Sequence, residues 1–174
     1  GHGRYAEGLK KNRKIEVWGV EMNPDAAFVA SQCIDKVICG AFPEVNGLPN
    51  KYFDCIQFND VLEHMLDPWN ALKSAKIYLV EKGSIVASIP NIRYLPILYK
   101  LVVRGEWNYS ESGTLDKTHL RFFTRKGIIE MFESAGYRVE QVKGLHPCNL
   151  WQIHLLKLFF PGFVRDCQYL QYAI

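Results

Sequence analysis

The stretch Tyr52–Pro68, with the sequence YFDCIQFNDVLEHMLDP, sets the expected architecture of the chain. It opens with a compact apolar run of the length that a buried strand needs. Asp67 and Pro68 then supply an N-cap and a first-turn proline for a helix. Ligands of open α/β sheets bind beyond the carboxyl ends of the strands. The polar side chains that follow this strand therefore form a candidate site: Asn59, Asp60, Glu63 and His64. An ordinary capped turn between strand and helix is the alternative interpretation.

Strands and helices alternate on both sides of this stretch. Short apolar runs predict three further strands, at Glu16–Val20, Lys36–Cys39 and, after a turn at Lys82-Gly83, Ser84–Ile89. Capping residues and helical spacing predict three helices, at Arg4–Lys11, from Asn23-Pro24 to about Gln32, and from Pro68 to about Val80. This alternation indicates an α/β fold with a mostly parallel sheet that helices cover on both faces.

The last third of the chain predicts one well-delimited helix and three weaker elements. Thr124 is a candidate N-cap, and Gly136 occupies the position where a left-handed residue ends a helix. The remaining patterns predict a strand at Tyr137–Lys143, an amphipathic helix at Leu150–Phe160 and a final strand at Cys167–Ile174.

Residues 92–121 interrupt the alternation. Compact domains rarely use about thirty residues as a plain connection. The segment begins with a predicted helix at Leu95–Val103 and continues as a polar and aromatic stretch. We expect a lid or substrate insertion that shields a reactive centre from water or shapes a pocket. A helix that covers the core, followed by a loop, is the alternative interpretation.

Composition favours one soluble domain that spans residues 1–174, since 48% of the residues are hydrophobic and 22% are charged. The net charge of +3 is too small to indicate a nucleic-acid surface. Five cysteines without a paired spacing favour reduced thiols and a cytoplasmic protein. The apolar stretches are too short for a transmembrane segment. The sequence predicts no particular oligomeric state.

A candidate nucleoside site lies near the start of the chain. Gly1 and Gly3 precede a predicted helix, and Glu21 ends the strand that follows it. Glycines let the backbone approach a ligand closely, and a carboxylate at a strand end accepts hydrogen bonds from ribose hydroxyls. The alternative is that the first residues are left over from an expression tag.

Taken in order, these motifs resemble the class I S-adenosylmethionine-dependent methyltransferases. Gly1-His2-Gly3 resembles the end of the glycine-rich motif of that family, and Glu21 in GVEMNP resembles its ribose-binding acid. FDCIQFNDVLEH is similar to the strand-four motif, and EKGSIVASIPN to the glycine turn and strand five. The sequences DVLEHMLDPW, DKTHLRFFTRKGI and FPGFVRD are similar to bacterial methyltransferase domains (types 11, 12 and 23) associated with the biosynthesis of cell-surface sugars and polysaccharides.

The resemblance implies a Rossmann-like, seven-stranded, mostly parallel sheet with helices on both faces and an antiparallel last strand. The first strand of that sheet is expected to lie outside the numbered chain. The implied cofactor is S-adenosyl-L-methionine, with contacts from Gly1, Gly3, Glu21, Met22, Ala41, Phe42, Asn59, Asp60 and Val61. Relatives commonly carry an acid near Gly40 that contacts the adenine, so a backbone contact or the Phe42 ring would replace it here.

The implied reaction is methylation of a hydroxyl, on a sugar, a glycan or another small molecule, with His64 and His119 as candidate bases. A divalent metal, Mg²⁺ or Mn²⁺, is an alternative, because Asp60, Glu63, His64 and His119 resemble the metal set of small-RNA 3′-end 2′-O-methyltransferases. Two further functions stay open. One is a metal-dependent RNA methyltransferase, against which the modest charge argues; the other is a catalytically degenerate domain for cofactor binding or interaction.

Overall fold

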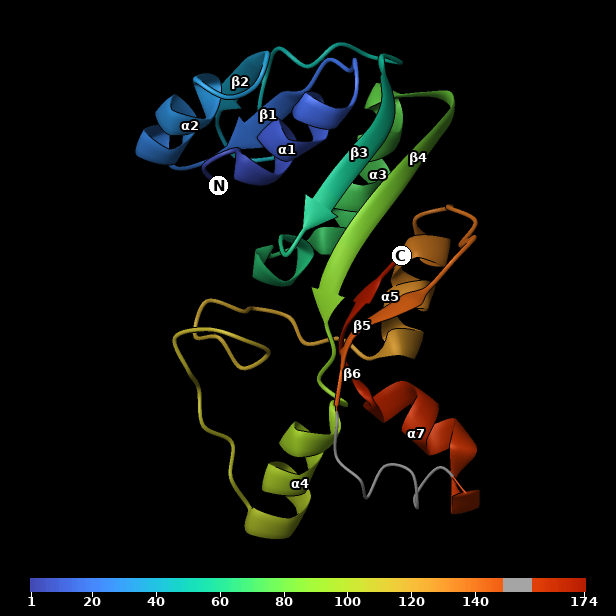
Figure 1. Ribbon diagram of the computed structural model, residues 1–174. Coiled ribbons are helices and arrows are strands. Elements are labelled where there is room, and N and C mark those ends of the chain that lie inside the picture. Colours follow the sequence, from blue (N-terminus) through green and yellow to red (C-terminus); the bar gives the residue numbers. More distant parts are fainter. Residues whose placement is uncertain (149–157) are drawn as a thin grey trace. The chain divides into compact units, whose positions relative to one another are not determined.

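The computed structural model of the protein describes residues 1–148 and 158–174 (Figure 1). The chain forms two compact units, Gly1–Tyr52 and Phe53–Ile174. They are called unit 1 and unit 2 below.

Unit 1 consists of two helix–strand pairs. Helix α1 covers Arg4–Asn12, strand β1 Trp18–Glu21, helix α2 Pro24–Ser31 and strand β2 Lys36–Cys39. The two strands are parallel and pair from Trp18 opposite Lys36 to Glu21 opposite Cys39. The Asn23 side chain caps α2 by accepting a hydrogen bond from the Ala26 amide at 3.0 Å. All four predicted elements of this unit are confirmed.

Unit 2 contains a mixed four-stranded sheet. Its strands are β3 (Phe53–Asn59), β4 (Leu79–Pro90), β5 (Lys143–Pro147) and β6 (Tyr169–Ala173), in the spatial order β3-β4-β6-β5. β3 and β4 are parallel, whereas β6 is antiparallel to both β4 and β5. Pro90 at the end of β4 lies opposite Gln171 near the start of β6. The carboxyl ends of β3 and β4 and the amino end of β6 therefore meet at one edge of the sheet.

The helices of unit 2 are α3 (Pro68–Tyr78), α4 (Leu95–Arg104), α5 (Arg125–Ser134) and α7 (Pro161–Cys167), with a short 3₁₀ helix, η1, at Leu62–His64. Asp67 caps α3 and Thr124 caps α5, as predicted. The core lies between the sheet and the helices and contains Leu62, Leu72, Ala87, Ile89, Ile128, Met131, Phe132 and Tyr172. Burial of these apolar side chains is the main contribution to stability.

The antiparallel last strand is confirmed, but the described residues form six strands in two sheets and not one sheet of seven. Two further predictions are wrong. Lys82-Gly83 is no turn, because β4 continues through it while the partner of β3 shifts from Leu79, opposite Phe53, to Ser84, opposite Cys55. The extra residues of β4 are taken up in that irregularity.

The strand predicted at Tyr137–Lys143 is also wrong, since β5 only begins at Lys143, where pairing with Ala173 starts. Tyr137 packs against α3 instead, and its hydroxyl donates a hydrogen bond to the Leu72 carbonyl at 2.8 Å. The final strand begins two residues later than predicted, because Cys167 ends the unpredicted helix α7. Most of the helix predicted at Leu150–Phe160 lies outside the described residues.

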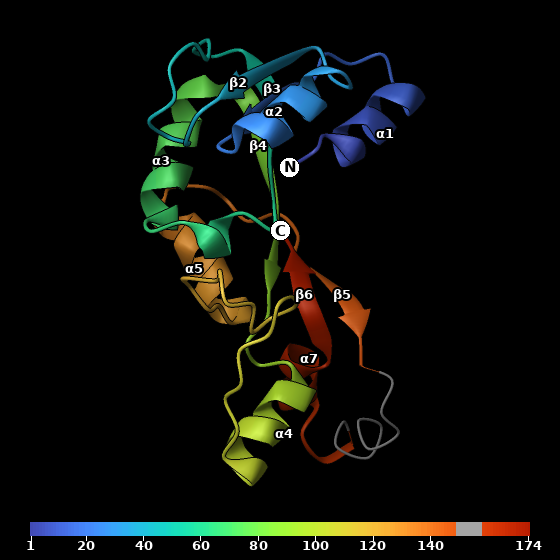
Figure 2. The same ribbon diagram turned by 90° about the vertical axis from the view of Figure 1, so that its left-hand side faces the viewer.

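The insertion at residues 92–121 starts and returns at the same place. The Ile92 amide donates to the Phe123 carbonyl at 2.9 Å, and Asn91 and Phe123 form an isolated parallel bridge. Buried Asn91 fixes this point by donating hydrogen bonds to the carbonyls of Asp166 and Tyr169, each at 2.9 Å. Figures 1 and 2 both show α4, within the insertion, beyond the carboxyl end of β4. None of the helices in the described residues is long and apolar enough to cross a membrane.

Candidate functional site

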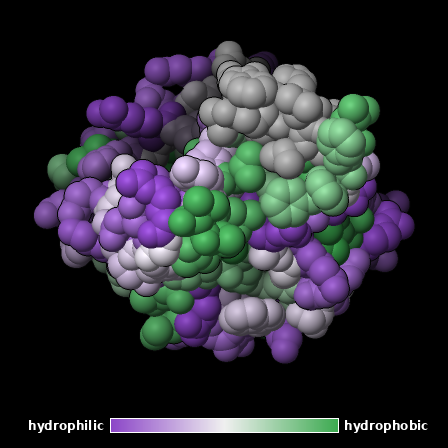
Figure 3. All heavy atoms as spheres, turned by 90° about the horizontal axis from the view of Figure 1, so that it is seen from below, coloured by the Kyte–Doolittle hydropathy of each residue, from purple (hydrophilic) through white to green (hydrophobic). Residues whose placement is uncertain are grey.

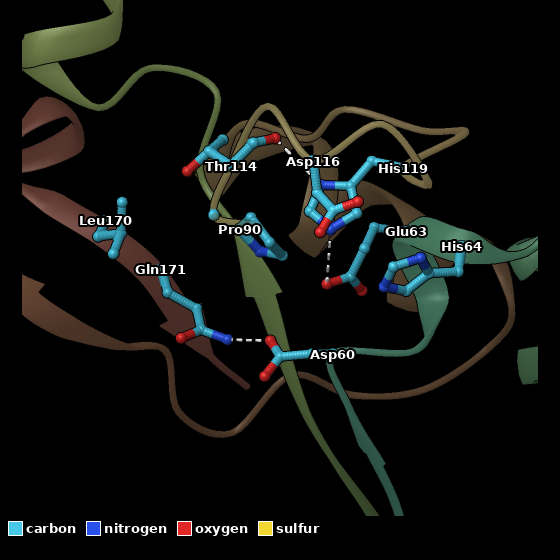
Figure 4. A pocket seen from close by; sticks show the side chains of 10 residues that line it. Asp60, Glu63, His64, Pro90, Thr114, Asp116, His119, Leu170 and Gln171 are labelled. Carbon is cyan, nitrogen blue, oxygen red and sulfur yellow. Dashed lines mark hydrogen bonds and ion pairs between the residues drawn. The ribbon is translucent and has the colours of Figure 1, made fainter. Parts of the chain in front are cut away.

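A cavity of about 280 Å³ lies at the edge of the unit 2 sheet where the carboxyl ends of β3 and β4 meet (Figure 4). Four segments line it: the turn from β3 into η1, the end of β4, residues 113–119 of the insertion and the start of β6. This is the edge at which the sequence predicts a ligand site. The insertion contributes one wall of the cavity.

Asp60 starts the turn after β3 and is held by the sheet. Its backbone is left-handed, with φ of 52°, and its amide donates to the Ser88 carbonyl at 3.1 Å. Its carboxylate accepts hydrogen bonds from the Ser88 hydroxyl, at 3.3 Å, and from the Gln171 side-chain amide. Asp60 is therefore a carboxylate whose hydrogen bonds the fold itself supplies.

Glu63, three residues later, has the opposite surroundings. Only 1% of it is exposed, and among the described residues neither carboxylate oxygen has a hydrogen-bond partner. Burial raises the pKa of Glu63 to about 7. A buried carboxylate without donors is costly unless a proton or a cation neutralises it. Glu63 is therefore the strongest sign of a functional role in this cavity.

His119 faces Glu63 from the insertion. Its Nδ1 lies 3.0 Å from the Thr114 carbonyl oxygen, which can only accept, so Nδ1 carries a proton. In the neutral imidazole, Nε2 therefore holds a lone pair. Nε2 lies 4.0 Å from Glu63 Oε1 (Figure 4). This pair can share a proton or bind a cation.

His64 is fixed in the same tautomer by Thr118. The Thr118 hydroxyl donates its one proton to Asp116 at 2.7 Å, so it accepts from His64 Nδ1, which is 3.1 Å away. The Thr118 carbonyl, at 3.2 Å, is a second acceptor for the same nitrogen. The hydrogen bond from Thr118 also lowers the pKa of Asp116. His64 is exposed at the mouth of the cavity and leaves its Nε2 free for a ligand.

Glu63, His64 and His119 form one cluster in which a ligand atom from each lies within 4.8 Å of the other two. The two imidazole rings meet edge to face, with 4.7 Å between their centroids. The structure therefore brings together both predicted bases and three of the four predicted metal ligands. Asp60 does not join the cluster, because its carboxylate is directed to Ser88 and Gln171.

The main chain of Glu63 also anchors the insertion. Its carbonyl accepts hydrogen bonds from the amides of Leu120, at 2.9 Å, and Arg121, at 3.0 Å. The Arg121 guanidinium donates to the Leu66 carbonyl at 2.7 Å. These contacts fix the segment that carries Thr118 and His119. Sequence analysis missed the groups that position the side chains of this site, which are Ser88, Thr114, Thr118 and Gln171. Only Thr118 had a signal in the sequence, because it lies in the closely spaced polar run DKTH.

The predicted nucleoside-binding residues of unit 1 lie together. The Gly1 nitrogen contacts the Glu21 carboxylate, whose other oxygen accepts from the Asn23 amide at 2.8 Å. Gly3 has φ of 76°, and a Cβ there would come within 3.2 Å of Ala30. The Gly40 amide donates to the Glu21 carbonyl at 3.0 Å, which places Ala41 and Phe42 directly after this point.

The other predicted cofactor contacts follow strand ends in both units. Met22 comes directly after β1 and is exposed. In unit 2, Asn59 ends β3, and Asp60 and Val61 follow it. The residues of unit 1 that the sequence assigns to the cofactor fit a nucleoside, because a carboxylate at a strand end, close-approach glycines and loop backbone occur together there.

Comparisons with solved structures show the fold. A methyltransferase dependent on S-adenosylmethionine from Archaeoglobus fulgidus is 18% identical over 99% of this chain and 80% of its own, with a TM-score of 0.70. A possible histamine N-methyltransferase from Thermotoga maritima is 19% identical over 99% and 75%, with a TM-score of 0.64. The methyltransferase bound to the Trm112 activator of Haloferax volcanii is 14% identical over 99% and 77%, with a TM-score of 0.63.

The sequence comparisons show the family. No curated protein matches the chain. The family model described as a methyltransferase domain matches residues 1–142, which is more than half of the 174 residues and includes residues of both units. The solved structures that share this fold include methyltransferases that depend on S-adenosylmethionine. The chain itself belongs to the methyltransferase domain family.

Proposed function

We propose that this protein transfers a methyl group to a hydroxyl of a sugar, a glycan or another small molecule. His119 accepts the hydroxyl proton, with His64 as the second candidate base, and the Glu63 carboxylate stabilises the resulting imidazolium. The observation that carries the proposal is the buried Glu63 carboxylate, which has no hydrogen-bond partner among the described residues and faces His119 Nε2 at 4.0 Å. The cavity beside this pair is open to a small acceptor.

We propose that the cofactor contacts Gly1, Gly3, Glu21, Met22, Ala41, Phe42, Asn59, Asp60 and Val61. When bound, S-adenosylmethionine supplies a methyl group on a positively charged sulfur. The Glu21 carboxylate would hold the ribose hydroxyls, and the glycines would admit its backbone contacts. Gly40-Ala41-Phe42 offers no carboxylate to the adenine, so backbone groups or the Phe42 ring would bind it.

In the proposed step, the bound cofactor would supply the methyl group, which would pass from its sulfur to the acceptor oxygen as the hydroxyl loses its proton. The hydroxyl proton goes to His119 Nε2, which is free because Nδ1 already donates to Thr114. The Glu63 carboxylate then stabilises the imidazolium. A positioned base contributes roughly 10²–10⁴-fold to such a step. Correct orientation of the reactants contributes about 7–11 kcal/mol more.

A divalent metal is a second candidate for the same three side chains, favoured by their ligand atoms lying within 4.8 Å of one another. Glu63, His64 and His119 would hold Mg²⁺ or Mn²⁺, with positions left for acceptor oxygens. The ion would lower the pKa of a bound hydroxyl. In this version, methylation of the 3′ end of RNA is the alternative reaction, although a net charge of +3 gives little electrostatic attraction to RNA.

The remaining expectations stay predictions. They are a single domain over residues 1–174, a lid function for residues 92–121, a seven-stranded sheet and a cytoplasmic location. A degenerate domain that binds the cofactor without turnover is the alternative to an active enzyme.

The test starts with calorimetric titration of S-adenosylhomocysteine into the protein. Binding followed by methylation of sugar hydroxyls supports the proposal, while binding without turnover on sugars, small alcohols or RNA ends supports the degenerate domain. Activity that survives EDTA supports proton acceptance by His119. Activity that EDTA abolishes and Mn²⁺ restores overturns that role in favour of the metal. No binding to the wild-type protein would contradict the assigned cofactor residues.

A further inference from the structure

Helix α4 has an unusual composition for its surroundings. Its sequence, LPILYKLVVR, is apolar or aromatic except for Lys100 and Arg104, yet it contains no buried residue. A helix with such a composition normally packs its apolar side against the core. The apolar side chains in the second half of α4 are thus not covered by the part of the chain that the structure describes.

The exposed part of α4 is its second half: all residues from Tyr99 to Arg104 are exposed, whereas residues 95–98 are partly covered. Lys100 and Arg104 are four residues apart and therefore share one face of the helix. Val102, on the opposite side, is 77% exposed, and Val103 is 65% exposed. The second half of α4 therefore exposes apolar side chains to water as well as the side that carries its two cations.

Exposed aromatic side chains also lie at the start of α7, which an ion pair and a cation–ring contact join to the residue before α4. Phe160 and Phe163 are exposed there, and the Arg93 guanidinium lies 5.5 Å from the centre of the Phe163 ring. Arg93 also pairs with Asp166 of α7 at 3.3 Å, which ties the beginning of α4 to that helix. Figure 3 shows apolar side chains gathered on this face. The apolar face is defined here by Tyr99, Leu101, Val102, Val103, Phe160 and Phe163.

The charges around α4 are mainly positive. Residues 93–106 contain Arg93, Lys100 and Arg104 but only one acid, Glu106. Glu106 pairs with Arg104 at 2.9 Å, whereas Lys100 has no ion pair among the described residues. An apolar helix side bordered by cations is complementary to a surface that is apolar inside and anionic at its edge. A phospholipid bilayer with anionic headgroups has this structure.

Size also favours a bilayer over a protein partner. A helix of ten residues is about 15 Å long and about 10 Å wide, so its footprint is roughly 150 Å². A stable protein interface needs roughly 800 Å² from each partner. The same length is half of the hydrocarbon core of about 30 Å, so α4 cannot span a membrane. It is long enough to lie in the plane of the interface.

We propose that α4, together with Phe160 and Phe163, binds the surface of an anionic phospholipid bilayer. Val102 and Val103 would enter the boundary between headgroups and acyl chains, and Lys100 and Arg104 would stay among the headgroups. This proposal does not rest on methyl transfer, so its success or failure leaves the assignment of Glu63 and His119 unchanged.

The test is co-sedimentation of the full chain with vesicles of phosphatidylcholine alone or with 30% phosphatidylglycerol. We expect binding to the anionic vesicles that weakens with salt. The double variant Val102→Asp and Val103→Asp should reduce binding about tenfold or more. Phe28→Asp is the matched control, because Phe28 is also 71% exposed but lies on α2, and it should bind like the wild type. Thermal unfolding confirms that each variant is folded.

A second variant tests the charge. Lys100→Glu should weaken binding to anionic vesicles several-fold and leave any binding to phosphatidylcholine vesicles unchanged. Equal sedimentation of the wild type and the double aspartate variant would overturn the proposal, as would no binding at low salt. A concentration-dependent dimer that the double variant abolishes would also overturn it, since a second copy of the chain would then cover the apolar face.

Discussion

The Glu63 cluster and helix α4 depart from ordinary burial in opposite directions. Glu63 is a carboxylate shut away from water without hydrogen-bond donors, whereas Val102 is an apolar side chain turned into water. Both lie in unit 2, and the insertion at residues 92–121 contributes to both. Each environment opposes the chemistry of its side chain, and each makes folding less favourable than a conventional residue would.

Neighbours in the same unit show that the fold can satisfy such groups. Asp60, three residues before Glu63, has its carboxylate hydrogen-bonded by Ser88 and Gln171. Leu72 on α3 is fully buried, unlike the valines of α4. The difference shows which partner each feature lacks. A polar ligand or a proton would satisfy the Glu63 carboxylate, and an apolar surface would cover the exposed side chains of α4.

The largest effect is expected at His119. His119→Asn should lower kcat/KM by roughly 10²–10⁴-fold, because the acceptor proton loses its base. The measurement is methyl transfer to an acceptor found active with the wild type. His146→Asn is the matched control, as His146 is exposed on β5 away from the cavity and should retain full activity. A fully active His119→Asn variant would show that His119 is not the base, and the Glu63 cluster would then have no demonstrated role in the reaction.

Glu63 should make stability depend on pH. Burial raises its pKa from 4.5 to about 7, so the folded protein holds this proton more tightly than the unfolded chain does. The free energy of unfolding should therefore fall as pH rises from 4.5 to 7, by about 3 kcal/mol in total, and stay level above. Urea unfolding at a series of pH values between 4.5 and 8 measures this change in the free energy of unfolding.

The control for this pH dependence is a pair of glutamine variants. Glu63→Gln should remove the fall in stability, whereas Glu130→Gln, at an exposed position on α5, should keep it. The same slope in the wild type and in Glu63→Gln would show that Glu63 is solvated or paired in solution.

A smaller effect is expected from the group that orients His64. Thr118→Val removes the hydroxyl that accepts from His64 Nδ1 at 3.1 Å, while the Thr118 carbonyl remains. Loss of one such hydrogen bond costs about 1 kcal/mol, so kcat/KM should fall roughly fivefold. Thr118→Ser keeps the hydroxyl and should recover most of the activity. If serine and valine behave alike, His64 does not depend on this contact.

The smallest effect is expected in α4. Val102→Ser should change the free energy of unfolding by no more than about 0.5 kcal/mol, since the side chain is already in water. Leu72→Ala, in the core, should cost about 2–5 kcal/mol in the same chemical denaturation experiment. A large loss from Val102→Ser would mean that the helix packs in solution, and the comparison between the two regions would fail.

Sequence analysis predicted elements best where local chemistry defines their ends. Asn23, Asp67 and Thr124 each accept a hydrogen bond from an amide three residues on, so the starts of α2, α3 and α5 were predictable. The errors occur where distant partners decide. β4 passes through Lys82-Gly83 because its pairing with β3 shifts there. β5 begins at Lys143 because this is the first residue that pairs with β6, opposite Ala173.

The candidate site follows the same division. Glu63 and His64 were predictable as polar residues after a strand, and His119 from the resemblance to a known family. The structure brings ligand atoms of these three side chains within 4.8 Å of one another, while their chemical roles stay predictions. The hydrogen bond from Gln171 to the Asp60 carboxylate was not predictable, because the two residues are 111 positions apart. It forms only because β6, which carries Gln171, lies beside β4. The outward apolar side of α4 was also hidden, since its sequence pattern equally suits a core helix.

The double hydrogen bond from Leu120 and Arg121 to the Glu63 carbonyl has a kinetic consequence. The segment that carries His119 cannot swing away without releasing these two amides from the residue that carries the acidic side chain. The exchange of these two amides with deuterium would therefore report how readily the site opens, residue by residue. Exchange that an acceptor slows would show that the acceptor stabilises the closed position of this segment.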